Sequence, residues 1–135
     1  MIHILVITHG ELGREMLKTA ENIIGKQEHV YVLGVTPGDS LTTMCSHTED
    51  LLQRLEGTGG TLILTDMLGG TPCNACLPFS TKYSVAIVTG LNLYMLLSAL
   101  MNRGIMELDK LSRKVLADGR KNIADAKEMF LEKLQ

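Results

Sequence analysis

The sequence has no tryptophan, two phenylalanines and three tyrosines, and no apolar run near the roughly 20 residues that a membrane-spanning helix needs. Its first residues enter an apolar stretch without the basic flank and cleavage site of a secretory signal. The net charge of −2 argues against nucleic acid as a partner, because nucleic-acid-binding proteins carry a basic patch. Three cysteines, an odd number, do not make a disulfide framework. We therefore expect a soluble, cytoplasmic protein.

What the chain does contain is a regular alternation of strand and helix patterns. At 135 residues, 45% of them hydrophobic, it is expected to form one domain, residues 1–135, with its own core. Short apolar runs predict strands at 2–7, 30–35, 61–65 and 84–89, and amphipathic periodicity predicts helices at 12–24, 40–55, from 71, and 92–102. This order predicts an α/β fold: a three-layer, doubly wound, mostly parallel sheet of about four strands with helices on both faces.

Local signals place several element boundaries. Gly25 ends the first helix, and Ser40 and Asn92 are predicted N-caps of later helices. Thr71 is predicted to cap a helix that has Pro72 at its first position. Residues 57–60 form the break before the third strand.

The C-terminal third has unusual apolar faces. The helix at 92–102 is apolar nearly all round, which predicts burial in the fold or at a subunit contact. From Glu107 the chain is charged, helical and without strand signals. Its apolar stripes lie on either side of Asp118-Gly119: Leu108, Leu111 and Val115, then Ile123, Lys127, Phe130, Leu131 and Leu134. A monomer exposing all these surfaces would carry a large apolar patch, so we expect a homodimer.

Two polar side chains follow apolar strands at the points where the strands end. His9 follows the first strand, and Asp66 follows the third. The carboxyl ends of parallel strands share one edge of the sheet, where reacting groups collect, so these two side chains are expected to meet. A carboxylate fixes the tautomer of an imidazole and supports positive charge on it, which suits nucleophilic or acid/base chemistry by His9.

The neighbouring residues predict an anion site. Gly10 and the pair Gly69-Gly70 permit close approach of a ligand to the backbone. Thr71 offers a hydroxyl beside the exposed N–H groups of a helix N-terminus, which suits phosphate. The nucleotide motifs GxxxxGK[ST] and GxGxxG are absent, so the phosphoryl group would have to come from another carrier.

Cys73 and Cys76 form a CxxC pattern that could support redox chemistry or half of a zinc site. No second CxxC completes a zinc set, and His3, His29 and His47 lie on different elements. We therefore interpret both cysteines as small buried helix residues, His47 as a solvated helix residue, and expect neither metal nor cofactor.

Four segments together resemble the mannose/fructose/sorbose-family enzyme IIA domain of the bacterial phosphoenolpyruvate:sugar phosphotransferase system. They are Ile7-Thr8-His9-Gly10, Pro37-Gly38, the stretch from Leu64 to Ala75, and the stretch from Thr89 to Leu96, and the likeness spans residues 1 to about 130. Cys73 stands where the family often has an aromatic residue, and Cys76 where a small residue is common. Some members carry a IIB domain fused downstream; because the sequence here shows none, a stand-alone IIA is expected.

The resemblance implies a phosphoryl carrier with His9 as the phosphorylated nucleophile. The histidine-containing phosphocarrier protein would donate the group and a IIB component would accept it for sugar uptake, in association with a membrane IIC/IID permease. Asp66 matches the carboxylate that partners the histidine, and Thr71 matches the hydroxyl residue after the Gly-Gly pair. The family commonly dimerises with C-terminal exchange, although the tail here shows no edge-strand pattern.

Three alternatives stay open. A regulatory IIA would signal through its phosphorylation state without transport. A histidine phosphatase also has a histidine after its first strand, but Thr8 stands where that motif has arginine. A two-component receiver domain has an aspartate at the end of its third strand, where Asp66 lies, but needs an acidic cluster after its first.

Overall fold

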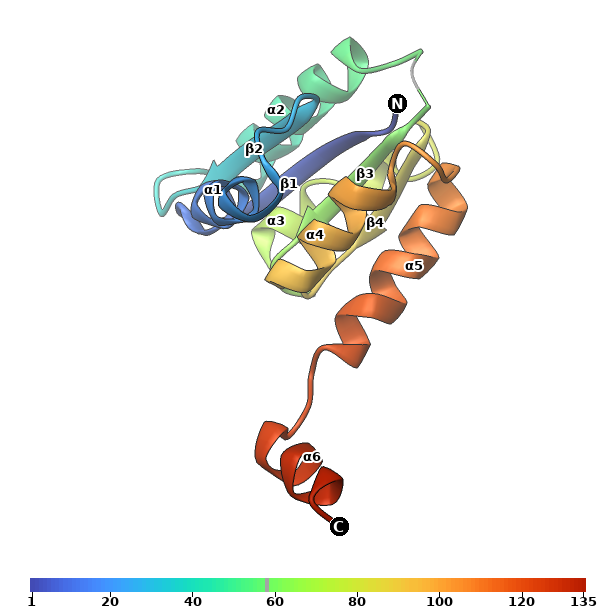
Figure 1. Ribbon diagram of the computed structural model, residues 1–135. Helices are drawn as coiled ribbons and strands as arrows, with labels where there is room; N and C mark the ends of the chain where they lie inside the picture. The colour runs from blue at the N-terminus through green and yellow to red at the C-terminus, as the bar shows by residue number, and fades with distance from the viewer. Residues whose placement is uncertain (58) are drawn as a thin grey trace.

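A four-stranded parallel sheet lies between two layers of helices in the computed structural model, which describes residues 1–57 and 59–135 (Figure 1). The strands are β1 (His3–His9), β2 (Val30–Val35), β3 (Thr61–Thr65) and β4 (Val85–Val88). Their order is β2-β1-β3-β4, and each neighbouring pair is parallel. The predicted three-layer, doubly wound α/β fold is confirmed.

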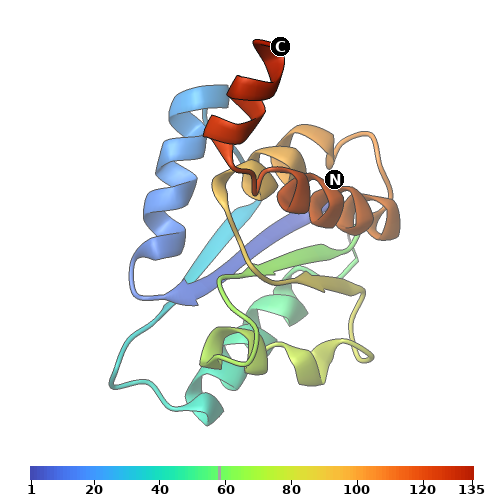
Figure 2. The same cartoon turned by 90° about the horizontal axis from the view of Figure 1, so that it is seen from below.

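Each face of the sheet has its own helical layer, as Figure 2 shows in a view from below. One face carries α1 (Leu12–Ile24), α4 (Leu93–Asn102) and α5 (Leu108–Lys121), and the other carries α2 (Leu41–Arg54), α3 (Thr71–Asn74) and the 3₁₀ turn η1 (Leu77–Phe79). Successive side chains of a strand point to opposite faces. In β1, therefore, Ile4 and Val6 join the first core while Leu5 and Ile7 join the second.

The predicted boundaries are mostly confirmed. Ser40 accepts a hydrogen bond from the Thr43 amide at 3.0 Å, and Asn92 accepts one from the Met95 amide at 2.9 Å. Gly25 ends α1 with a positive φ of 92°. The predicted break at 57–60 includes Thr58, which lies outside the described residues.

The first strand is longer than its apolar run predicts. Thr8 and His9 pair with Gly34 and Val35 of β2, so β1 continues through His9. Polar side chains do not stop a strand whose backbone still has a partner. His9 is therefore the last residue of the strand rather than part of a following turn.

The nearly all-apolar α4 is covered within the chain, because α1 and α5 both pack against it. The buried residues of α4 are Met95, Leu96, Ser98, Ala99 and Leu100. Helix α5 runs through Asp118-Gly119 without a break, and Gly119 packs against Met95, where a Cβ atom would collide with the Met95 side chain. Tyr94 and Met101, on the outer side of α4, stay exposed.

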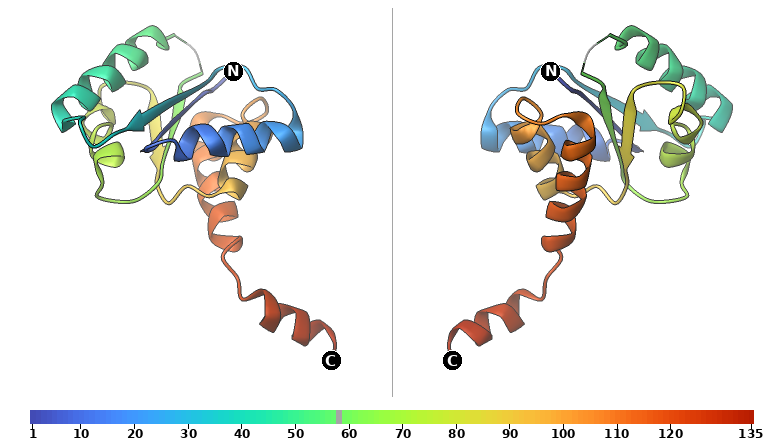
Figure 3. Two further views of the ribbon diagram at one scale, coloured as in Figure 1. Left: turned by 90° about the vertical axis from the view of Figure 1, so that its left-hand side faces the viewer. Right: turned by 90° about the vertical axis from the view of Figure 1, so that its right-hand side faces the viewer.

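The last helix, α6 (Ala126–Lys133), projects from the body after a short linker, as Figures 1 and 3 show. It has no buried residue. The predicted apolar stripe is in solvent, with Ile123, Phe130 and Leu134 all at least 61% exposed. Among the described residues, no helix has the length and apolar character needed to cross a membrane.

Candidate functional site

The candidate site lies where the sheet reverses its winding direction. From β1 the chain crosses to β2 on one side, whereas β3 and β4 follow on the other side of β1. Ligands of open α/β sheets bind at the carboxyl ends of the strands beside such a switch point. His9 ends β1 and Asp66 directly follows β3, so the two predicted residues flank it.

His9 and Asp66 are joined by two hydrogen bonds to a single oxygen. The Nδ1 atom of His9 lies 2.8 Å from Oδ2 of Asp66, and the backbone N–H of His9 donates to the same Oδ2 at 2.9 Å. The other carboxylate oxygen accepts the backbone N–H of Met67 at 3.0 Å. The carboxylate is thus held at three points, and it in turn fixes the position and rotation of the imidazole.

The surroundings of Asp66 keep it ionised. Partial burial acts against the charged form, but the hydrogen bonds from the backbone and imidazole of His9 outweigh burial and hold the pKa of Asp66 below its usual value. An ionised carboxylate only accepts hydrogen bonds, so the proton of the neutral His9 ring is on Nδ1. The unprotonated Nε2 is then the nucleophilic atom. The side chain of His9 is 49% exposed and that of Asp66 only 10%.

The turn after His9 is held from both sides. Gly10 has a positive φ of 53°, which favours glycine, and its N–H donates to the Val35 carbonyl at 2.8 Å. The buried Thr8 hydroxyl accepts the N–H of Gly13 at 2.8 Å, in the first turn of α1. Thr8 thereby acts as the capping group, since the N-cap residue Glu11 makes no side-chain cap bond.

The Gly-Gly-Thr segment lies beside the imidazole, but its helix starts differently from the prediction. Gly70 is the N-cap of α3, and Thr71 is the first helical residue, so the prediction of Thr71 as N-cap is wrong. Gly70 also lies close to the ring: a Cβ atom there would lie 3.0 Å from His9 Cε1 and 3.5 Å from Nε2, so a side chain would crowd the imidazole. Gly69 precedes it with a φ of +83°.

An open cleft borders the ring. His9, Gly10 and Thr71 line it together with Val35, the last residue of β2, and with Thr36, Pro37 and Asp39 of the β2–α2 loop. The predicted residues His9, Gly10 and Thr71 therefore meet at one cleft. The contribution of the β2–α2 loop was missed, although Pro37-Gly38 at a strand end was a usable signal.

The cysteines are unsuited to redox chemistry. Cys73 and Cys76 are buried free thiols on and just after α3, and Cys76 Sγ donates to the Cys73 carbonyl. Burial, with a smaller contribution from the neighbouring thiols, raises the pKa of Cys76 to about 12. Reactive cysteines are thiolates in exposed, electropositive settings. Within residues 1–57 and 59–135, no group of three or more His, Cys, Asp or Glu side chains is arranged to hold a metal ion.

Two histidines treated as separate in the sequence meet at the opposite end of the sheet. The rings of His3 and His29 pack edge to face with centroids 5.0 Å apart. His3 is 7% exposed, and its Nδ1 is buried without a hydrogen-bond partner among the described residues. His47 is exposed, as predicted. This pair lies at the other end of β1 from His9 and does not line the cleft.

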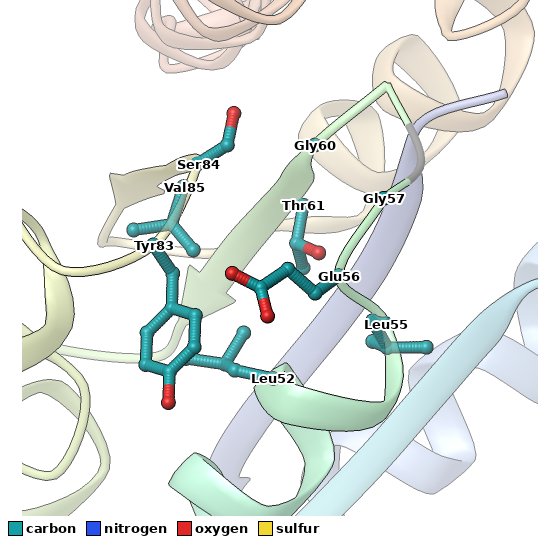
Figure 4. Close-up of a pocket in the computed structure, with 9 residues that line it drawn as sticks. All are labelled: Leu52, Leu55, Glu56, Gly57, Gly60, Thr61, Tyr83, Ser84 and Val85. Atoms are coloured by element: carbon teal, nitrogen blue, oxygen red, sulfur yellow. The ribbon is translucent and has the colours of Figure 1, made fainter.

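A second hollow, at the amino ends of β3 and β4, is too small to be a substrate site. It is lined by nine residues of α2, β3, β4 and their adjoining loops, and Figure 4 shows the Glu56 side chain directed into it. Its volume of about 30 Å³ has room for about one or two water molecules. The cleft beside His9 is the site that the geometry favours, because it is lined by the imidazole that Asp66 orients.

Comparison with known proteins gives a matching family model, described as the fructose IIA component of the phosphotransferase system, over residues 3–116. The mannose-specific EIIAB component of Escherichia coli K12 is 33% identical over 98% of this chain. The chain spans only 42% of the length of that relative. The sorbose-specific EIIA component of Lacticaseibacillus casei is 28% identical over 82% of this chain and 80% of its own length.

Solved structures show the same architecture. An EIIA component from Streptococcus agalactiae is 32% identical, with a TM-score of 0.85 over 93% of this chain and 97% of its own. A mannose/sorbose-specific IIA subunit from Enterococcus faecalis is 25% identical, with a TM-score of 0.86 over 92% and 93% of the two chains.

Proposed function

The chain belongs to the phosphotransferase-system enzyme IIA family whose model is described as the fructose IIA component, and from this membership we propose that it is a phosphoryl carrier with His9 as the phosphorylated residue. The observation that carries the proposal is the bonding of His9 Nδ1 and of the His9 N–H to one oxygen of Asp66, beside the switch point of the sheet. This bonding leaves Nε2 free and directed away from the carboxylate.

The transfer step follows from the tautomer. The Nε2 lone pair attacks the phosphorus of the donor's phosphohistidine, a new N–P bond forms, and the donor's N–P bond breaks with its electron pair returning to the donor ring. His9 loses no proton, so its ring becomes cationic. Asp66 balances that charge through the Nδ1–H hydrogen bond. When the next acceptor attacks the phosphorus, the N–P bond breaks, its electron pair returns to Nε2, and His9 is neutral again.

The glycines and Thr71 form the phosphate-binding part of this proposal. Gly70 keeps the space beside the imidazole free of a side chain, and Gly69 supplies the positive φ of the turn before it. Gly10 turns the backbone away without adding a side chain, and Thr71 lines the cleft. Helix α3 has four residues, so its dipole is small, and we assign phosphate contact to the hydroxyl and the backbone of the loop.

We propose the histidine-containing phosphocarrier protein as donor and a IIB component as acceptor, linked indirectly to a membrane IIC/IID permease for sugar uptake. We place this exchange in the cytoplasm and assign no nucleic-acid partner and no cofactor. The rim around His9 supports docking of a protein, because Leu12, Leu41, Met67 and Leu68 are between 45% and 77% exposed on loops and helix starts at this edge. Exposed apolar groups gathered in this way are typical of protein-binding surfaces.

A homodimer is part of the proposal. Helix α6 has eight residues and none buried, whereas isolated helices need about 12–15 residues to be even marginally stable in water. We infer that its apolar stripe, together with the exposed side of α4, packs against a second copy. A two-fold contact would cover both surfaces at once.

Phosphorylation with purified components tests the function. The protein is incubated with phosphoenolpyruvate, enzyme I and the phosphocarrier, and label is expected in the wild-type protein and in His47→Ala but not in His9→Ala. The label should be lost in acid, as phosphohistidine is. Unchanged labelling of His9→Ala would refute the assignment, and acid-stable label on Asp66 would favour a receiver domain.

Two further measurements separate the remaining alternatives. Hydrolysis of a chromogenic phosphomonoester would favour a histidine phosphatase. Transfer from phosphorylated protein to a IIB component distinguishes a transport IIA from a regulatory one, which would hold its phosphoryl group without passing it to sugar.

A further inference from the structure

The β2–α2 loop forms part of the wall of the cleft and lies beyond the end of the sheet. Up to Val35 the chain is held against β1, because Gly10 donates to the Val35 carbonyl and a Cβ atom on Gly34 would collide with the Gly10 carbonyl. From Thr36 onward the β2–α2 loop, residues 36–39, extends past the ends of the strands (Figure 1). Sheet hydrogen bonds no longer hold it there.

Asp39 supplies the bonds that hold this loop. Its Oδ2 accepts the Thr36 N–H at 2.8 Å and the Thr36 hydroxyl at 3.0 Å, and its own N–H donates to the Thr36 carbonyl at 3.0 Å. Ser40 follows directly as the N-cap of α2. Hydrogen bonds thus link the first and last residues of the loop, Thr36 and Asp39, and the loop continues directly into α2.

The Asp39 carboxylate accepts both of its hydrogen bonds from Thr36, within the loop itself. The hydrogen bonds from the backbone and hydroxyl of Thr36 hold the pKa of Asp39 below its usual value, so the carboxylate is ionised and both bonds are charge-assisted. With the carboxylate bound to Thr36, the loop presents Pro37 to the cleft and Leu41, 45% exposed, to solvent just beyond it. These are apolar contacts suited to a protein surface, not to a sugar or a free anion.

We propose that Asp39 is a positioning residue, which holds the β2–α2 loop in the shape that docks the phosphocarrier protein beside His9. The inference rests on the proposed function, since it takes His9 as the phosphoryl acceptor. The hydrogen bonds of the Asp39 side chain go to Thr36 and not to His9. Its effect is on the encounter with the donor protein and not on the chemical step.

A small phosphoryl donor separates docking from chemistry, because phosphoramidate transfers its phosphoryl group to histidine without a protein surface. In Asp39→Ala, the KM for the phosphorylated carrier is expected to rise about ten-fold, with kcat within about two-fold of wild type. Labelling by phosphoramidate should be unchanged. Asp39→Asn keeps an acceptor oxygen for Thr36 and should recover most of the lost affinity, whereas Asp50→Ala, an exposed aspartate on α2, should match wild type.

Each outcome has a distinct meaning. A KM unchanged in Asp39→Ala, or a fall in kcat at constant KM, would overturn the docking role. An equal loss with carrier and phosphoramidate would overturn it as well, because Asp39 would then belong to the chemistry of the site. If wild-type protein accepts label from neither donor, the proposed function itself fails. Thermal melting checks folding, and Thr36→Val, which removes only the hydroxyl bond, is expected to raise KM less than Asp39→Ala.

Discussion

At the scale of single residues, the site depends on one carboxylate that restrains both the backbone and the ring of the same histidine. Asp66 is mostly buried and His9 is half exposed, so the orienting group is protected while the reactive nitrogen faces the cleft. Charge-assisted hydrogen bonds are about twice as strong as neutral ones. Separate predictions follow for Asp66, which orients the ring, and for Gly70, which lies beside it.

Replacing Asp66 by asparagine is expected to slow phosphoryl transfer by roughly ten- to a thousand-fold, equivalent to ~1.4–4 kcal/mol of transition-state stabilisation. The amide keeps the shape but loses the charge that balances the cationic ring. Rapid-quench measurement of His9 labelling gives the rate, and circular dichroism checks the fold. Near wild-type transfer in a folded Asp66→Asn protein would mean that the carboxylate is only structural.

Gly70→Ala should block the imidazole. The backbone φ of Gly70 is −84°, so alanine is not strained there, but its Cβ would lie 3.0 Å from His9 Cε1. We expect transfer to fall by about ten-fold or more, equivalent to ~1.4 kcal/mol. Gly104→Ala is the matched control, because a Cβ at that position meets nothing within 4 Å and Gly104 lies outside the cleft and the β2–α2 loop. Equal rates for the two variants would show that the space beside His9 is not needed.

At the scale of elements, the two ends of β1 have opposite characters. The carboxyl end presents His9 to solvent, and the amino end buries His3 against His29 and Tyr31. Arg103, at the end of α4, is buried nearby and donates to the carbonyls of Glu28 and His29. No carboxylate appears among its described hydrogen-bond partners. Positive charge at this end of the sheet is therefore poorly compensated.

This arrangement predicts acid sensitivity. Burial, followed by His29, the N-terminal amine and Arg103, lowers the pKa of His3 from its ordinary 6.5, so the unfolded chain binds the proton more readily than the folded one. The free energy of unfolding should hold its full value above pH 6.5 and fall as the pH drops below it, by at most about 1.4 kcal/mol per pH unit.

Denaturant unfolding between pH 5 and 8, for wild type, His3→Leu and His47→Gln, measures the effect. The His3→Leu protein should lose less stability in acid than wild type, and the exposed control His47→Gln should lose as much. Parallel pH profiles for all three proteins would contradict the assignment to His3.

At the scale of the whole molecule, the compact body and α6 differ in how they are stabilised. The body has a core on each face of the sheet, while α6 has none of its own. The exposed apolar surface of α6 is the main structural reason to expect that two copies of the chain form a dimer.

Sedimentation is expected to give a dimer of about twice the chain mass of 14.8 kDa at micromolar concentration. Phe130→Glu should shift the protein toward monomer, because it places a charge in the apolar stripe. Lys133→Glu is the control, because it changes the charge of α6 outside the predicted stripe, whereas Lys127 lies on that stripe. A monomeric wild-type protein would refute the dimer.

The sequence determined the parallel architecture and the position of the candidate site. Short apolar runs that alternate with amphipathic helices favour a parallel sheet with crossovers, which places the residues after each strand at one edge. His9, Asp66 and the Gly-Gly-Thr segment could therefore be assigned to one site from spacing alone, and cap residues such as Ser40 and Asn92 follow from local hydrogen bonding.

Only the tertiary structure decided the contacts between segments distant in sequence. The strand order makes β1 and β3 neighbours, which brings both His9 donors to one oxygen of Asp66. It also puts Gly70 beside the His9 ring, and α3 begins after Gly70 rather than after Thr71. The same packing pairs His3 with His29 and makes the β2–α2 loop part of the wall of the cleft. Local periodicity could not predict these contacts, because it reports which face of an element is buried and not which element buries it.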